Sequence, residues 1–168
     1  AEVVQAQAGS NVNTIEAYVN YSQTQNVQNL VGEGTANVTL TGSDAGGTIT
    51  ANTGKDVLVG GNGNETLVSG TGVDTLIGGI GNNVFVINNA GDIVQAQATA
   101  TSNSLQSTVS YTEPENVHSL TGRGTGPLAL IGNDQASVVT ASGAGSTLTA
   151  GTGVTTLVGA AGQASWIN

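Results

Sequence analysis

The feature that most constrains the fold is a nine-residue repeat in the middle of the chain. Three kinds of residue return there at intervals of nine. The glycines are Gly54, Gly63, Gly72 and Gly81, the acidic or amide residues are Asp56, Glu65, Asp74 and Asn83, and the large apolar residues are Leu58, Leu67, Leu76 and Phe85. A fixed short period is typical of a solenoid, in which each unit buries its apolar side chain against the units before and after it. The repeat therefore predicts a fold built by stacking.

A longer period divides the chain into two homologous halves, residues 1–90 and 91–168. The segment "VVQAQ" at 3–7 recurs 90 positions later as "IVQAQ", whereas "GTGVDTLIG" from Gly70 matches "GTGVTTLVG" from Gly151, 81 positions later. The second half has therefore lost one nonapeptide, and the pattern is intact on both sides of the loss. This indicates that the nonapeptide is a structural unit, and we expect one continuous domain over residues 1–168.

Short strands are expected at the apolar positions. Segments such as "DVLVG" and "DTLIG" centre on Leu and are bounded by glycines that can adopt positive φ in tight turns. Side chains alternate along a strand, so the Leu series should face inward. The less regular stretches 11–40 and 103–130 are expected to be wider turns of the same stack, with "TIEAYVNY" and "STVSY" as longer strands. A sandwich of ordinary short strands is the alternative, but it does not explain the constant spacing.

The charge balance argues against several classes of partner. The chain has 11 Asp and Glu against 2 Lys and Arg, a net charge of −9. Nucleic acid is excluded as a partner because its recognition starts with a basic patch that neutralises phosphates. Insertion into a membrane is excluded because no apolar run approaches the roughly 20 residues of a spanning helix. With one histidine, His118, and no cysteine, nothing brings a catalytic set together, and we expect no enzyme.

The repeats resemble those of the RTX family, whose nonapeptide G-G-x-G-x-D-x-U-x, with U a large apolar residue, binds Ca²⁺ in its turns. "GGNGNETLV" at 60–68 departs from this pattern only at Glu65, "SGTGVDTLI" at 69–77 only at Ser69, and "GGIGNNVFV" at 78–86 only at Asn83. The resemblance implies an all-β fold, a right-handed parallel β-solenoid of the β-roll kind.

In the family's roll two nonapeptides make one turn, so residues 18 apart stack. The resemblance then places Asp56 and Asp74 on one edge and Glu65 and Asn83 on the other, and it implies that these four residues hold Ca²⁺. Two carboxylates one strand spacing apart repel each other unless a cation lies between them. Calcium suits the position because it takes 6 to 8 oxygens, of which turn carbonyls can supply several.

Two considerations limit the calcium hypothesis. Alternatively, the acidic residues are remnants of calcium sites, and the solenoid is held together by Asn, Ser and Thr side chains that hydrogen-bond to the backbone of the turns. Calcium is expected in the first half only, because the second half has no acid at the matching positions, which are Ser137, Ser146, Thr155 and Ala164.

The two ends of the sequence are in phase with each other. "ASWIN" at 164–168 aligns with "NVFVI" at 83–87, and "AEVVQAQ" at 1–7 resembles "GDIVQAQ" at 91–97. We therefore expect a secreted, non-enzymatic structural protein whose ends cap one another, with Trp166 as an anchor, so that identical subunits stack head to tail into an extracellular fibre or matrix. The alternative is a calcium-binding repeat module of a larger secreted RTX protein, such as an adhesin, a toxin or the export tail of a hydrolase. Ice binding through rows of threonines is a further class, but Val57 and Val59 interrupt the rows.

Overall fold

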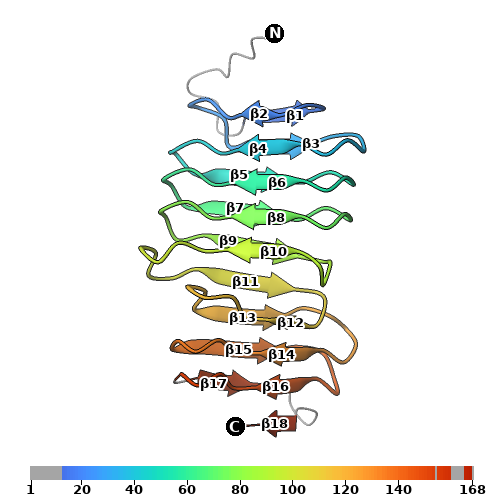
Figure 1. Cartoon of the computed structure of the whole chain (residues 1–168), viewed down its shortest axis with the longest axis vertical. Helices are drawn as coiled ribbons and strands as arrows, with labels where there is room; N and C mark the ends of the chain where they lie inside the picture. The colour runs from blue at the N-terminus through green and yellow to red at the C-terminus, as the bar shows by residue number, and fades with distance from the viewer. Residues whose placement is uncertain (1–12, 154, 160–164, 168) are drawn as a thin grey trace.

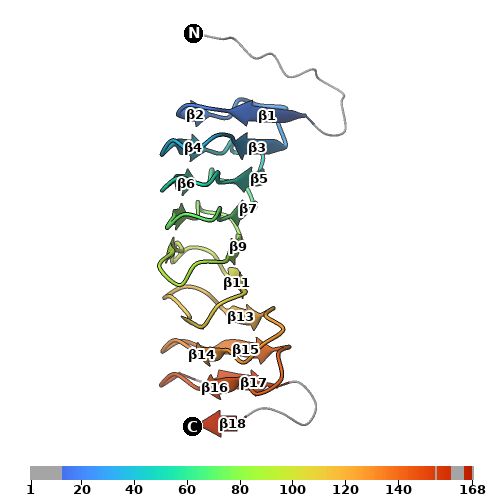
Figure 2. The same ribbon diagram turned by 90° about the vertical axis from the view of Figure 1, so that its right-hand side faces the viewer.

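The chain forms a stack of short parallel strands with no helix among the residues described. The computed structural model describes residues 13–153, 155–159 and 165–167. Its strands are two to five residues long, and consecutive strands lie on opposite faces of a coil (Figures 1 and 2). No helix of the described residues has the length and apolar character that crossing a membrane requires.

One face of the coil is a continuous nine-stranded sheet. Its members are β1 (Thr14–Ala17), β3 (Asn29–Gly32), β5 (Gly47–Thr50), β7 (Glu65–Val68), β9 (Val84–Ile87), β11 (Ser104–Ser107), β13 (Ser119–Gly122), β15 (Ser137–Ala141) and β17 (Thr155–Val158). The opposite face is divided into a five-stranded sheet and a four-stranded sheet. The first contains β2 (Tyr21–Ser22), β4 (Thr39–Thr41), β6 (Val57–Val59), β8 (Thr75–Ile77) and β10 (Ile93–Gln95), and the second contains β12 (Tyr111–Thr112), β14 (Ala129–Ile131), β16 (Thr147–Thr149) and β18 (Ser165–Ile167).

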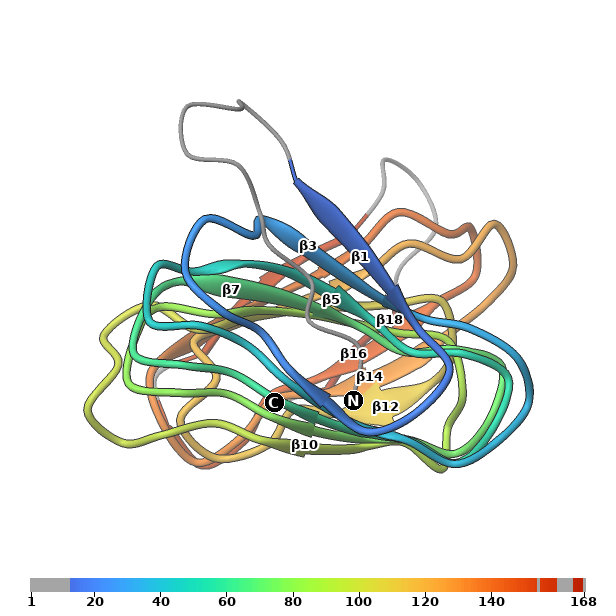
Figure 3. The same cartoon turned by 90° about the horizontal axis from the view of Figure 1, so that it is seen from above.

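Apolar side chains 18 residues apart stack in register between the two faces. Leu58 pairs with Leu76, and Leu67 pairs with Phe85, in parallel strands. All four side chains are fully buried in a core that runs the length of the stack. Seen along the stack in Figure 3, successive turns lie over one another as a flattened coil. The predicted parallel β-solenoid with an inward-facing Leu series is confirmed.

The irregular stretches belong to the same stack, with turns of different length. Thr14 pairs with Asn29, which lies 15 residues later, and Val84 pairs with Ser104, which lies 20 residues later. The expected longer strands in "TIEAYVNY" and "STVSY" are wrong, because residues 18–20 and 108–110 are turns. The strands are four or five residues long on the nine-stranded face and two or three on the opposite face, so the backbone must leave the sheet after that length.

Beyond the missing nonapeptide, equivalent residues of the two halves lie on opposite faces. One nonapeptide spans half a turn. The "TLI" of β8 therefore lies in the five-stranded sheet, while its counterpart "TLV" at 156–158 lies in β17 of the nine-stranded sheet. In the same way β9 belongs to the nine-stranded sheet and its counterpart β18 to the four-stranded sheet.

The expected joint between the chain ends falls largely outside the described residues, which omit 1–12, 160–164 and 168. The backbone of Trp166 pairs in register with Leu148 in β18. Its side chain lies outside the described part of the structure.

Candidate metal centre

The candidate ligands lie in turns at the two edges of the coil. On the first edge, turns such as 51–56 and 69–74 lead from the nine-stranded sheet to the opposite face, and they carry Asp56 and Asp74. On the second edge, turns such as 42–46, 60–64 and 78–83 lead back. Glu65 and Asn83 follow the second-edge turns and lie at the start of β7 and just before β9.

The first edge contains a column of buried aspartates. The Asp74 carboxylate lies between two successive turns, since Oδ1 accepts a hydrogen bond from the backbone N–H of Asp56 and Oδ2 accepts one from Gly70, both 2.8 Å long. Asp56 binds the N–H groups of Val38 and Asn52 in the same way, at 2.8 and 2.7 Å. A carboxylate has about four lone-pair sites, so each of these side chains can still coordinate a cation.

Asp92 is a third member of this column. Its Oδ1 accepts a hydrogen bond from the N–H of Asp74 at 2.9 Å, and its Oδ2 accepts one from Asn89 at 3.2 Å. The sequence analysis missed this residue, although it lies nine positions after Asn83. The preceding "INNAG" does not match the glycine pattern of the other units, but the spacing of nine alone was a sufficient signal.

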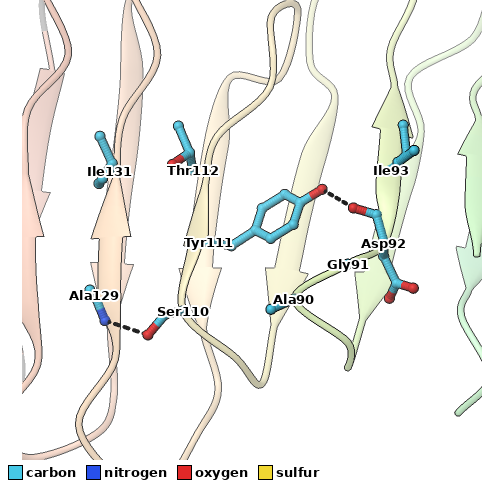
Figure 4. Close-up of a pocket in the computed structure, with 9 residues that line it drawn as sticks. All are labelled: Ala90, Gly91, Asp92, Ile93, Ser110, Tyr111, Thr112, Ala129 and Ile131. Carbon is cyan, nitrogen blue, oxygen red and sulfur yellow. Dashed lines mark hydrogen bonds between the residues drawn. The ribbon is translucent and has the colours of Figure 1, made fainter. Parts of the chain in front are cut away.

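The column ends at Asp92, where the second face of the coil is interrupted. β10 and β12 belong to different sheets, and the Tyr111 hydroxyl donates a 2.6 Å hydrogen bond to the Asp92 carbonyl oxygen across the break (Figure 4). Burial raises the pKa of Tyr111, and the negative charge of Asp92 raises it further. The Tyr111 side chain thus links the last strand of the five-stranded sheet to the first strand of the four-stranded sheet.

Among the described residues, no positively charged side chain stabilises the Asp74 carboxylate. Burial raises the pKa of Asp74, and the neighbouring charges of Asp56 and Asp92 raise it further, while the hydrogen bonds from the N–H groups of Asp56 and Gly70 lower it. A cation between the turns would relieve this repulsion.

On the second edge, Glu65 is a buried carboxylate without hydrogen bonds. Its side chain is 2% exposed, and neither Oε1 nor Oε2 has a hydrogen-bond partner in the described structure. Burial raises its pKa from the ordinary 4.5 to about 7; Asp44 contributes in the same direction, and the nearby amide of Gly61 opposes it. Leaving a buried carboxylate unpaired is costly, so this position favours either a proton or a cation.

The Asn83 side chain has hydrogen-bond partners for both its oxygen and its nitrogen, so it needs no bound ion. Its Oδ1 accepts a 2.9 Å hydrogen bond from the N–H of Glu65, and its Nδ2 donates to the carbonyl oxygens of Gly79 and Gly81 at 3.2 and 2.8 Å. The structure therefore keeps Glu65 and Asn83 together on the second edge, as expected, but gives them different roles. Asn83 bonds to carbonyls of its own turn and to the N–H of Glu65 in the layer before, whereas the Glu65 carboxylate lies beside the glycines of its own turn, with Oε2 3.0 Å from where a Cβ on Gly60 would stand.

At the glycines of the repeat, the backbone of one turn lies close to carbonyl oxygens of the turn in the preceding layer. On the first edge, a Cβ on Gly70 would overlap the carbonyl oxygen of Asn52, and a Cβ on Gly72 would overlap that of Gly54. On the second edge the same relation holds between Gly61 and Ser43.

Close approach, not backbone conformation, is the reason for glycine at Gly61, Gly70 and Gly72. The glycines with positive φ in the described residues are Gly34, Gly46, Gly47 and Gly145, so a left-handed backbone does not account for glycine at these three positions. Within the described residues no three acidic or histidine side chains form a cluster. An ion between the turns would therefore be coordinated largely by carbonyl oxygens, with one or two carboxylates, which is a donor set that Ca²⁺ accepts.

In the second half a hydroxyl group closes the turn at one of the matching positions, Ser146. Ser146 Oγ accepts a 3.1 Å hydrogen bond from the N–H of Leu128 and donates to the carbonyl of Gly143 at 2.9 Å. Ala164 lies outside the described residues.

Comparison with known proteins identifies the repeats. Residues 41–76 and 59–86 match the family model of the RTX calcium-binding nonapeptide repeat (4 copies). The resemblance is thus confirmed for these residues, and the calcium-binding repeats lie in the first half of the chain. No curated protein and no solved structure matches the chain.

Proposed function

We propose that this chain is a non-enzymatic, calcium-binding structural solenoid, with its ions between the stacked turns of residues 42–74. The premise is that residues 41–86 contain RTX repeats, which bind calcium. The observation that carries the proposal is Glu65, whose two buried carboxylate oxygens have no partner. The Asp56 and Asp74 column provides the corresponding position on the first edge.

Calcium would act on these turns by joining successive layers. When bound, it supplies a positive charge that carboxylates and carbonyl oxygens can share. Asp74 is already held by N–H groups from two turns, and Gly70 leaves the Asn52 carbonyl exposed to the same space. An ion bound only by the stacked state stabilises that state in proportion to the logarithm of its concentration.

The experiment is isothermal titration calorimetry with CaCl₂ on the intact chain, combined with thermal unfolding in calcium and in EDTA. We expect saturable binding and a melting temperature that rises with calcium. The double variant with Glu65→Gln and Asp74→Asn should lose both effects. Equal melting temperatures in calcium and EDTA, with no binding heat, would refute the proposal.

The buried polar groups of the second half support a structural role. His118 Nδ1, Ser137 Oγ and Glu113 Oε1 are buried and unpaired, and burial raises the pKa of Glu113. The cleft beside them is lined by Glu113 but by neither His118 nor Ser137. A substrate in that cleft would therefore contact neither this serine nor this histidine.

We further propose that the protein is secreted and assembles end to end into an extracellular fibre or matrix. RTX repeats are characteristic of secreted proteins. Support for stacking comes from the junction inside the chain, where the second half adds to the first by parallel pairing of β11 with β9. A second copy of the chain would add by the same type of backbone pairing, a heterologous contact that need not close.

The alternative is that the chain is a calcium-binding repeat module of a larger secreted protein. Light scattering and negative-stain imaging in calcium separate the two. Filaments whose length grows with concentration would support assembly, and monodisperse particles of 16.5 kDa at micromolar concentration would contradict it.

A further inference from the structure

The second residue of each nonapeptide unit divides the described turns into two classes. It is glycine at Gly61, Gly70, Gly79 and Gly151, and a residue with a hydrogen-bonding side chain at Asn52, Asn88, Asn133 and Ser142; Ser43, whose buried Oγ has no hydrogen-bond partner, belongs to neither class. In each case this residue faces a turn of the preceding layer, so its identity determines what lies between the two layers.

In the second class, the side chain donates hydrogen bonds to carbonyls of the preceding layer. Asn133 Nδ2 donates to the carbonyl oxygens of Pro114 and Val117 at 2.8 and 2.7 Å, while its Oδ1 accepts from the N–H of Gln135 at 2.9 Å. One amide group thus satisfies two carbonyls of one layer and one N–H group of the next.

Asn52 makes the same set of bonds on the other edge. Its Nδ2 donates to the carbonyl oxygens of Ala36 and Glu33 at 2.9 and 3.3 Å, and its Oδ1 accepts from the N–H of Gly54 at 2.5 Å.

The turn 88–92 and Ser142 follow the same principle. Asn88 donates from Nδ2 to the carbonyl oxygen of Ser69 at 3.4 Å, and the third residue of the unit, Asn89, adds a bond from its Nδ2 to the Gly72 carbonyl at 3.1 Å. Ser142 Oγ donates to the carbonyl oxygen of Gly122 at 2.8 Å.

In the glycine class, the facing carbonyls have no side-chain donor. No side chain of the described residues donates to the carbonyl oxygens of Asn52, Gly54 or Gly61, which face Gly70, Gly72 and Gly79. A carboxylate at the sixth position accompanies the glycine in two of these units, Gly61 with Glu65 and Gly70 with Asp74. In the other two units the sixth residue is Asn83 or Thr155.

We propose that the second residue of a unit decides whether calcium or a side-chain amide joins two layers. An amide nitrogen carries two N–H donors and can satisfy two carbonyls, as a bound cation does. Calcium is then held at two positions, one with Gly61 and Glu65 and one with Gly70 and Asp74. Asn52 takes the ion's place next to Asp56, where a carboxylate is present but the space is filled. This inference rests on the proposed calcium binding.

The test compares two Asn→Gly variants of the intact chain. Asn52→Gly removes the amide in a unit whose sixth residue is Asp56, and Asn133→Gly removes it in a unit whose sixth residue is Ser137. Asn62→Gly, at an exposed side chain in a turn, controls for the backbone freedom that any new glycine adds. The probe is CaCl₂, read out by titration calorimetry and by the melting temperature in EDTA and in calcium.

In EDTA, we expect Asn52→Gly and Asn133→Gly each to melt roughly 4–8 °C below Asn62→Gly, because two interlayer hydrogen bonds are lost. In calcium, Asn52→Gly should bind three ions where the unaltered chain binds two, and it should regain its melting temperature. Asn133→Gly should bind two ions and stay destabilised.

The outcomes separate this inference from the proposed function. An unaltered chain that binds calcium, with Asn52→Gly showing no additional ion and no rescue, would overturn the inference and leave the proposed function standing. The inference would also be overturned if Asn52→Gly and Asn133→Gly had the same melting temperature as Asn62→Gly in EDTA. An unaltered chain that binds no calcium would refute both.

Discussion

At the scale of single residues, Glu65 is the side chain whose charge depends most on solution conditions. Burial raises its pKa from 4.5 to about 7, so between these values the folded, calcium-free protein holds a proton that the unfolded chain has released. The free energy of unfolding in EDTA should therefore fall as the pH rises from about 4.5 to about 7, by at most about 3 kcal/mol from this residue.

Urea unfolding of the unaltered chain and of Glu65→Gln over pH 4.5–8 in EDTA isolates this effect. The glutamine keeps the neutral shape, so the difference between the two stabilities should grow with pH. Parallel pH profiles would show that Glu65 titrates normally.

Asp74→Asn should lower the calcium stoichiometry by one. The Oδ1 of an asparagine can accept the hydrogen bond from the N–H of Asp56, as Asn83 does from Glu65, but its Nδ2 cannot accept the bond that Oδ2 of Asp74 takes from the N–H of Gly70. We expect a loss of about 1–3 kcal/mol in EDTA. Asp134→Asn, at an acid of the second half that binds the N–H of Thr152, is the matched control. If it lowers the stoichiometry as Asp74→Asn does, the assignment of Asp74 is wrong.

The sequence predicted part of this site and could not predict the rest. Spacing of 18 was sufficient to place Asp56 above Asp74, because stacking follows from the period. It could not show that Asn83 uses its own amide on Gly79 and Gly81, since the direction in which a side chain turns depends on the neighbouring layer. The spacing of nine was sufficient to predict Asp92, but this residue was missed because the glycines around it do not follow the pattern of the other units.

At the scale of turns and strands, Gly70 should be among the least replaceable residues. A Cβ there would overlap the carbonyl oxygen of Asn52, whereas a Cβ on Gly126 would meet nothing within 4 Å. We expect Gly70→Ala to lower the free energy of unfolding by about 2 kcal/mol or more and to weaken calcium binding. Gly126→Ala should change it by about 0.5 kcal/mol or less. Equal effects in chemical denaturation would contradict the close approach of the two turns.

Strand position was predictable within the nine-residue repeat, but strand length was not. The apolar period did not locate the strands that contain Leu30, Leu105 and Leu120. The segment "TIEAYVNY" contains a turn at 18–20 in which Tyr18 and Val19 are exposed. Their composition favours a strand, and the narrow coil overrides that preference.

At the scale of the whole molecule, stability should be divided along the axis. Each layer contacts only its neighbours, so local opening reflects local interactions. Calcium would join layers in the first half, whereas amides and hydroxyls join them around Asn133 and Ser146. Hydrogen exchange in EDTA should be faster in turns 42–46, 60–64 and 69–74 than around 132–146, and calcium should slow it mainly in the first group. Uniform protection by calcium along the chain would contradict this division.

The shortened second half has a consequence for any longer array of these units. Each unit moves the chain to the other side of the coil, as the placement of β8 and β17 in different sheets shows. Adding or removing an even number of units leaves every downstream surface residue facing the same way, while an odd number reverses it. Whether the number of units is odd or even, rather than any change in the motif itself, would therefore determine on which face of the solenoid a given sequence lies.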